Sequence, residues 1–208
     1  MNTPRTSGAA GARVDWLPLV TVALGFVMAM LDVTVVNVAL GDVRADLSAS
    51  LSTLVWVVDG YTLSFAALLL AGGALANRFG ARAVYVVGLA LFVVASILCG
   101  AAPGAAALVA ARLLQGCAAA LFIPSSLGLL TLAYPDHAVR ARMLGLWAAV
   151  VSMSAASGPL VGGVVVTWLG WRAIFLLNVP IGLAGIWLAR RHLVATTGRP
   201  QALNLAAH

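Results

Sequence analysis

The chain has 208 residues, of which 62% are apolar and only 9% are charged. Soluble domains are about half apolar and a quarter charged, so this composition excludes an ordinary soluble domain and indicates a protein of the lipid bilayer. The twelve arginines and six aspartates leave a net charge of +6, which in a membrane protein is interpreted by its position along the chain and not as affinity for nucleic acid.

Six apolar segments are each long enough to cross a bilayer as a helix, which takes about 20 residues. They cover approximately residues 16–40, 52–76, 83–101, 104–130, 141–166 and 172–190. These runs are too long for strands and lack the alternation of a membrane barrel, so we predict an all-α integral membrane bundle. We expect residues 1–15 to form a cytoplasmic N-terminal segment and residues 191–208 a cytoplasmic polar tail. The first apolar run is followed by no small-residue cleavage pattern, so we expect it to be retained as the first span.

The distribution of arginine predicts how the bundle is oriented. One side of the predicted bundle carries Arg5, Arg13, Arg78, Arg82, Arg140, Arg142, Arg190, Arg191 and Arg199. The other side carries only Arg44 and Arg172, while Arg112 lies within a span. Because cytoplasmic loops collect positive charge, we predict a multi-pass protein of the inner (plasma) membrane with both termini in the cytoplasm.

Three charged residues lie inside the predicted spans: Asp32, Asp59 and Arg112. At about 1.5 Å per residue, all three lie roughly 10–12 Å below the outer surface. Ionisable groups are expensive at that depth, so each is a candidate for a proton-coupling residue. Low polarity favours a neutral carboxyl group and a neighbouring guanidinium favours a charged one, so movement of the arginine would switch protonation. A static ion pair, or an aspartate shallow enough to stay hydrated, is the alternative.

Glycine and proline cluster in the fifth predicted span, at Gly158, Pro159, Gly162 and Gly163. Proline kinks a helix and glycine lets a neighbouring helix approach closely. The cluster is typical either of a hinge or sealing surface or of an ordinary close-packed crossing, and both interpretations stay open.

No arrangement of residues in the sequence indicates an enzyme or a metal site. His137, His192 and His208 are scattered, and Cys99 and Cys117 lie in apolar runs without metal-ligand spacing. The sequence contains no HExxH, GxSxG or phosphate-binding loop. We therefore predict neither enzymatic activity nor a bound metal or cofactor.

Five motifs, taken together, resemble the N-terminal half of a major facilitator superfamily transporter, of the fourteen-span drug:proton antiporter type. They are residues 31–40 (LDVTVVNVAL), 73–82 (GALANRFGAR), 112–116 (RLLQG), the fifth-span set Gly145, Gly158, Pro159, Gly162 and Gly163, and residues 171–182 (WRAIFLLNVPIG). The motifs follow the family's order and fall on the predicted spans. The resemblance covers about residues 14–193.

The resemblance implies export of small, often apolar or cationic molecules, driven by the proton gradient without a cofactor. Asp32 and Arg112 would be coupling residues, with Asp59 as a further candidate. Gly73, Asn77, Arg78, Gly80 and Arg82 would hold the cytoplasmic gate, and Gly158 and Pro159 would shape a fifth helix that limits leak.

The chain departs from the family pattern at three positions and in length. Asn77 replaces the usual aspartate of the gate loop, Ala81 stands where a basic residue is common, and Gly41 stands where proline often ends the first-span motif. Family members carry a second six-span half, and their substrate sites lie between the halves. We therefore expect either pairing with a second half or a second copy in the bilayer, or a truncated product that only packs with other proteins.

Overall fold

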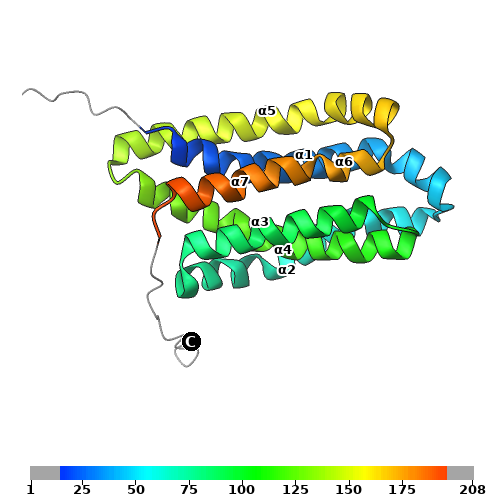
Figure 1. Ribbon diagram of the computed structural model, residues 1–208, viewed down its shortest axis with the longest axis horizontal. Helices are drawn as coiled ribbons and strands as arrows, with labels where there is room; N and C mark the ends of the chain where they lie inside the picture. The colour runs from blue at the N-terminus through cyan, green and yellow to red at the C-terminus, as the bar shows by residue number, and fades with distance from the viewer. Residues whose placement is uncertain (1–14, 196–208) are drawn as a thin grey trace, which may run out of the picture.

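The computed structural model describes residues 15–195, and these residues form helices without any strand. The helices are α1 (Leu17–Leu47), α2 (Leu51–Phe79), α3 (Ala81–Gly100), α4 (Ala105–Ala133), α5 (His137–Leu169), α6 (Arg172–Leu176) and α7 (Asn178–His192). Six candidate spans result, because α6 and α7 together form the sixth, and the predicted six-span bundle is confirmed (Figure 1). The expected N-terminal segment and polar tail lie mostly outside the described residues.

Helix α1 extends well beyond its predicted end near residue 40. It has 31 residues, which corresponds to about 46 Å, whereas the hydrocarbon core of a bilayer is about 30 Å thick. The added turns carry Asp42, Arg44 and Asp46, all of which are exposed. Hydropathy predicts only the part of a helix that crosses lipid, so it does not predict a polar extension of the same helix.

The sixth span is a single helical path with one weak point between α6 and α7. Leu177 joins the two segments with helical backbone angles, φ −60° and ψ −30°. Pro180 has no N–H to donate to the carbonyl of Leu176, four residues earlier, so one helical hydrogen bond cannot form there. Asn178 lies at this point, facing the interior of the bundle, and is 2% exposed.

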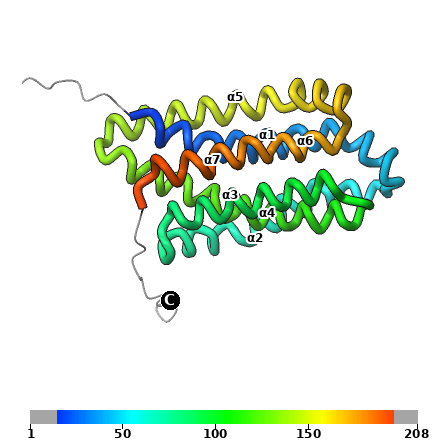
Figure 2. Tube along the Cα trace, viewed as in Figure 1, coloured from blue at the N-terminus to red at the C-terminus, as the bar shows by residue number. Residues whose placement is uncertain are grey.

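The helices run side by side, and α1 begins at the same end of the bundle where α7 finishes (Figures 1 and 2). We call this the basic end, because six arginines of the described chain lie there: Arg78, Arg82, Arg140, Arg142, Arg190 and Arg191. The opposite end has Arg44 and Arg172. This asymmetry of charge follows the pattern expected of a membrane protein with one cytoplasmic face.

Close packing of α2 against α4 depends on glycine. A Cβ atom on Gly72 would collide with the backbone of Ala120, and one on Gly116 would collide with the backbone of Tyr61. Gly73, the next residue along α2, has no atom within 4 Å of such a Cβ position. Helices in lipid associate mainly through close contact of small residues, so Gly72 and Gly116 set the distance between these two spans.

Aromatic side chains fill the core between α2, α3 and α4. Phe92 stacks edge-on against Phe122 with ring centroids 5.6 Å apart, and Tyr85 and Tyr61 extend this ladder at 6.3 Å and 6.5 Å. Edge-to-face contacts of this kind add about 0.5–1.5 kcal/mol each to the burial of the rings. The ladder holds α3 at a fixed height relative to α4.

Two spans are much more open than the others. In the most apolar 18-residue windows of α2 and α5 only 17% of residues are buried, against 56% for α1 and α3 and 50% for α4. Leu63 and Leu70 of α2, and Met153 and Leu160 of α5, are among the exposed large apolar side chains. Both helices therefore present apolar surface to whatever surrounds the bundle.

We expect Gly72→Ala to destabilise the bundle by about 1–3 kcal/mol, because the added methyl group collides with the backbone of α4. Gly73→Ala is the matched control: it has open space and removes a helix-weakening glycine, so it should be neutral or stabilise by up to about 1 kcal/mol. The midpoint of thermal loss of helical circular dichroism in detergent measures both. Equal midpoints for the two variants would show that α2 and α4 are not held by this contact.

Candidate functional site

A buried ion pair joins α1 to α4 near the middle of the bundle. The Arg112 guanidinium donates from Nη1 to Oδ2 of Asp32, and each side chain is 1% exposed. The structure thus brings together two of the three charged residues predicted inside the spans. Removing one partner of a buried pair of this kind lowers the free energy of unfolding by about 3–5 kcal/mol, because the remaining charge has no partner.

The guanidinium of Arg112 also contacts α2 and the sixth span. Its Nε donates to the backbone carbonyl of Val57 at 2.9 Å. Its Cζ lies 4.5 Å from the ring centroid of Tyr61 and 5.9 Å from that of Phe175. Cation–π attraction to aromatic faces is strengthened where water is excluded, so these rings help to stabilise a charge that is unfavourable in an apolar environment.

The other carboxylate oxygen of Asp32 is bound by two amide side chains. Asn178 donates from Nδ2 to Oδ1 at 2.8 Å, and Gln115 donates from Nε2 to the same oxygen at 3.3 Å. Asp32 is therefore surrounded by donors from α4 and α7. The bonds from these two amides and from Arg112 leave neither carboxylate oxygen of Asp32 without a donor.

Gln115 connects the ion pair to α3. Its Oε1 accepts from Arg112 at 2.9 Å and from the Cys99 thiol at 3.2 Å, and its Nε2 donates to Ser96 Oγ at 2.8 Å. Ser96 also lies 3.4 Å from Nδ2 of Asn178. The result is one continuous polar network with members from α1, α3, α4 and α7. We refer to Asp32, Ser96, Cys99, Arg112, Gln115 and Asn178 as the central network.

Asp59 stands outside the central network. Its side chain is exposed on α2, and it makes no hydrogen bond or ion pair with another described residue. Depth in the membrane was predicted from the sequence, but the direction in which the side chain points was not. A coupling role for Asp59 stays a prediction.

The fifth-span glycines divide into two groups. Gly158 and Gly162 are buried against α1: a Cβ on Gly158 would collide with the side chain of Thr34, and one on Gly162 would lie 3.1 Å from Cγ1 of Val35. Cβ positions on Gly145 and Gly163 meet no atom within 4 Å, and Pro159 is exposed. Two of the four glycines therefore bring α5 against the part of α1 that follows Asp32.

The predicted gate loop is reduced to a single residue between two helices. Gly80 joins α2 to α3 with φ +92°, a backbone conformation that favours glycine. Arg82 donates from Nη2 to the carbonyl of Arg190 near the end of α7, and Arg78 lies over the ring of Phe79 at 5.2 Å. Asn77 is exposed and Gly73 is half-buried. The loop arginines thus contact their own half of the bundle, including a neighbouring helix end.

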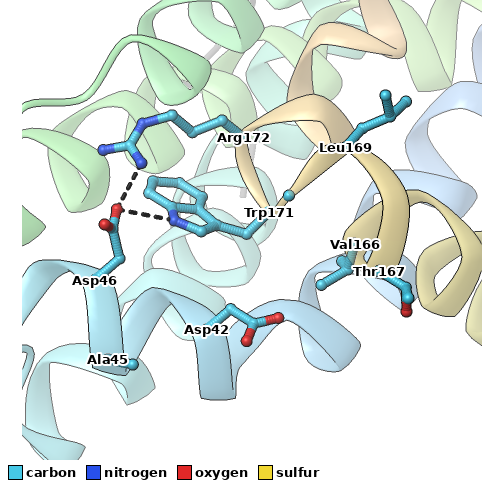
Figure 3. Close-up of a pocket in the computed structure, with 9 residues that line it drawn as sticks. Asp42, Ala45, Asp46, Val166, Thr167, Leu169, Trp171 and Arg172 are labelled. Atoms are coloured by element: carbon cyan, nitrogen blue, oxygen red, sulfur yellow. Dashed lines mark hydrogen bonds and ion pairs between the residues drawn. The ribbon is translucent and has the colours of Figure 1, made fainter.

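A second polar cluster lies at the opposite end of the bundle, where α1 meets α6. Figure 3 shows Asp46 facing the indole of Trp171 and the guanidinium of Arg172, with hydrogen bonds of 3.1 Å and 2.5 Å. Arg172 also donates to the carbonyl of Ala102 at 3.4 Å. The cluster borders an open hollow of about 740 Å³, which Asp42 also lines. With side chains 41% and 47% exposed, this ion pair is a surface clamp of modest strength.

The arrangement offers no place for a metal ion within residues 15–195. No three histidine, cysteine, aspartate or glutamate side chains of that range come together.

A sequence model described as the Major Facilitator Superfamily matches residues 22–206. The chain belongs to the Major Facilitator Superfamily. A methylenomycin A resistance protein of Bacillus subtilis is 56% identical over 91% of this chain, and one of Streptomyces coelicolor is 49% identical over 100% of it. A tetracenomycin C resistance and export protein of Streptomyces glaucescens is 42% identical over 89%. The chain spans 41%, 46% and 34% of the length of these three relatives.

The fold agrees with this membership. A crystal structure of a peptide transporter superposes with a TM-score of 0.73 over 83% of this chain and 37% of its own, at 18% sequence identity. At that identity the likeness establishes the arrangement of the helices alone. The family to which the chain belongs is a family of transporters and not of enzymes, in agreement with the sequence-based prediction.

The sequence identifies Asp32 and Arg112 as candidate site residues, but it does not identify most of their partners. Ser96, Cys99 and Asn178 are neutral, so they carry no signal of misplaced charge in an apolar span. The spacing of these residues gives a weak signal. Ser96 and Cys99 are three residues apart and share one face of a helix, as do Arg112 and Gln115.

The ion pair predicts non-additive stability effects. We expect Asp32→Asn and Arg112→Gln each to destabilise by about 3–5 kcal/mol, because each leaves a buried charge without its partner. The double variant should be less destabilised than the sum, with a coupling of at least about 1 kcal/mol. The free energy of unfolding in mixed detergent, measured for the unaltered protein, the two single variants and the double variant, gives this double-mutant cycle. Additive effects would show that the two residues do not interact in the folded protein.

Proposed function

We propose that this chain forms one half of a proton-coupled efflux transporter for small apolar or cationic molecules. The observation that carries the proposal is the buried pair of Asp32 and Arg112, enclosed by amide side chains from the neighbouring spans. An ionisable group inside a membrane bundle is expensive and marks a pathway for ions or protons. The names of the relatives, which refer to antibiotic resistance and export, favour efflux as the direction.

Protonation of Asp32 is the step that this geometry couples to movement. A neutral carboxyl group carries no net charge to attract the guanidinium, so Arg112 loses its only ionic partner among the described residues. The guanidinium retains its bond to the Val57 carbonyl and its contacts with the rings of Tyr61 and Phe175. A proton therefore loosens α1 from α4 while α4 stays attached to α2.

The partner is a second six-span half, or a second copy of this chain, packed against α2 and α5. These are the two spans with the most exposed apolar surface. Substrate sites in such transporters lie at the interface between halves. Asp59, exposed on α2, would then lie near this interface and meet either a cationic substrate or the partner.

The gate loop and the fifth-span glycines would control access. Gly73, Asn77 and Arg78 of α2, the joining residue Gly80 and Arg82 of α3 lie toward the basic end, where a gate against the second half would close. Gly158 and Gly162 let α5 pack tightly along α1, Pro159 would shape the helix between them, and such a seal would limit proton leak. The proton gradient across the inner (plasma) membrane is the energy source, and the basic end faces the cytoplasm with both termini.

Transport is tested in liposomes with an imposed pH gradient, using methylenomycin A as the first probe. The chain is reconstituted alone, and together with the part of the Bacillus subtilis relative that it does not match. We expect efflux that collapses with the gradient when both parts are present. Asp32→Asn should abolish it, because the amide cannot carry the proton.

The control for this experiment is Asp42→Asn, which makes the same chemical change on the same helix at an exposed position. It should transport at the unaltered rate. Undiminished coupled efflux in Asp32→Asn would remove this residue from the proton pathway. Absence of transport from correctly inserted, helical protein in both reconstitutions would favour a chain that only packs with other membrane proteins.

Orientation is tested by cysteine labelling of intact cells with a membrane-impermeant maleimide. In a background lacking Cys99 and Cys117, we expect Ser52→Cys at the opposite end to react. Ala138→Cys, near the start of α5 at the basic end, should react only after the membrane is broken. The reverse pattern would place the termini outside the cytoplasm.

A further inference from the structure

A small cavity lies directly beside Asp32, between α1 and the sixth span. Its volume is about 10 Å³. Asp32 and Asn178 line it, together with apolar side chains of the two spans that include Val36 and Ile174. A cavity of this size admits one water molecule, which binds stably where two or more polar groups can bond to it.

Asn178 carries a hydrogen-bond acceptor that the described residues do not use. Its Nδ2 donates to Asp32 and lies 3.4 Å from Ser96 Oγ, whereas its Oδ1 accepts from none of the described residues. The residue is 2% exposed, and buried polar atoms of this kind usually bind protein groups or ordered water. The carboxylate of Asp32 receives three donors and has about four lone-pair sites, so it can accept one more.

One face of α1 leads from this cavity to the hollow at the opposite end of the bundle (Figure 3). Residues three and four apart share a helix face, and this face carries Asp32, Val35, Ala39, Asp42 and Asp46. On the sixth span, Trp171 and Arg172 line the hollow, and Ile174 and Asn178 line the cavity. We call the contact between this face of α1 and the sixth span the α1–α6 seam.

The seam is closed between the hollow and the cavity. Ala39 and Val43 of α1 and Phe175 of α6 are each at most 1% exposed and belong to one apolar cluster. At the opposite end the seam is held by the bonds from Trp171 and Arg172 to Asp46, and exposed ion pairs of this kind are weak. The seam therefore opens most easily from the opposite end.

We propose that the cavity is a binding site for one water molecule, supplied from the opposite end through the α1–α6 seam. The water donates one O–H group to the Asp32 carboxylate and the other to Oδ1 of Asn178. A hydronium ion in the same place transfers one proton to a carboxylate oxygen and leaves a water molecule, so the step needs no other reactant. This proton transfer rests on the proposed function, whereas the water site does not.

Radiolytic labelling of the purified chain in detergent tests the water site. X-ray pulses convert water into hydroxyl radicals, which oxidise the nearest side chains, and mass spectrometry locates the products. Ile174 lines the cavity and is 4% exposed, whereas Ile123 does not line it and is 8% exposed. We expect Ile174 to be oxidised faster than Ile123. An equal or slower rate at Ile174 would overturn the proposal.

Two variants remove the site in different ways. Asn178→Leu removes the acceptor, and Val36→Ile fills the cavity with one added carbon while every polar group stays. In both, oxidation of Ile174 should fall to the level of Ile123. Val22→Ile makes the same change about 21 Å away along α1 and should leave the labelling as it was. Persistent labelling in Val36→Ile, or an equal loss in Val22→Ile, would argue decisively against the site.

The direction of supply is tested with Leu177→Cys, at another residue that lines the cavity. In a Cys99→Ser and Cys117→Ala background, intact cells are treated with a small, membrane-impermeant methanethiosulfonate. We expect labelling that becomes faster when Asp46→Asn weakens the seam. Leu183→Cys, on the same span but 54% exposed toward lipid, should stay unlabelled. Labelling of Leu177→Cys only in broken membranes, or at a rate that Asp46→Asn leaves unchanged, would exclude this route.

Failure of the water site and failure of the proposed function give different results. Fast oxidation of Ile174 in a chain without coupled efflux would support the water site and remove its part in proton transfer. Coupled efflux by a chain in which Ile174 is oxidised no faster than Ile123 would keep the proposed function and overturn the water site.

Discussion

The ion pair between Asp32 and Arg112 is the interaction on which the rest of this bundle depends. Both charges are removed from water, and the attraction between them repays that loss only if their remaining donors and acceptors are also bound. Here the second carboxylate oxygen receives two amide groups, and the guanidinium reaches a backbone carbonyl and two aromatic rings. These partners come from α2, α4, α6 and α7, so the pair is stable only when those helices are in place around α1.

Small residues make this arrangement geometrically feasible. Gly116 is one turn beyond Arg112 on α4, and Tyr61 is one turn beyond Val57 on α2. The contact of Gly116 with the Tyr61 backbone and the bond from Arg112 to the Val57 carbonyl therefore belong to one crossing. A larger residue at 116 would move α4 away and leave the arginine unable to reach that carbonyl. The close helix packing at Gly116 is therefore also the condition for the Arg112 hydrogen bond.

How far the sequence predicts the site depends on the kind of information involved. Hydropathy predicts six spans and the depth of a charged residue, and it places Asp32, Asp59 and Arg112 in one layer without showing which aspartate meets the arginine. It does not predict rotation about the helix axis. Val57 faces the arginine, and Asp59 is two residues further, about 200° around the helix, so it faces away. Asn178 belongs to the family motif at residues 171–182, yet nothing in its neutral side chain indicates a bond to Asp32, 146 residues away in the chain.

The sixth span is attached to α1 at two points of very different strength. At the opposite end of the bundle the Asp46–Arg172 pair is nearly half exposed, and such pairs contribute about 0–1 kcal/mol. In the interior, Asn178 binds the carboxylate of a buried pair whose disruption costs several times more. Separation of these helices at the exposed end therefore meets little resistance, whereas separation in the interior requires the charge of Asp32 to be removed first. A proton would remove that charge, which is why we assign the proposed coupling to the buried pair and not to the surface clamp.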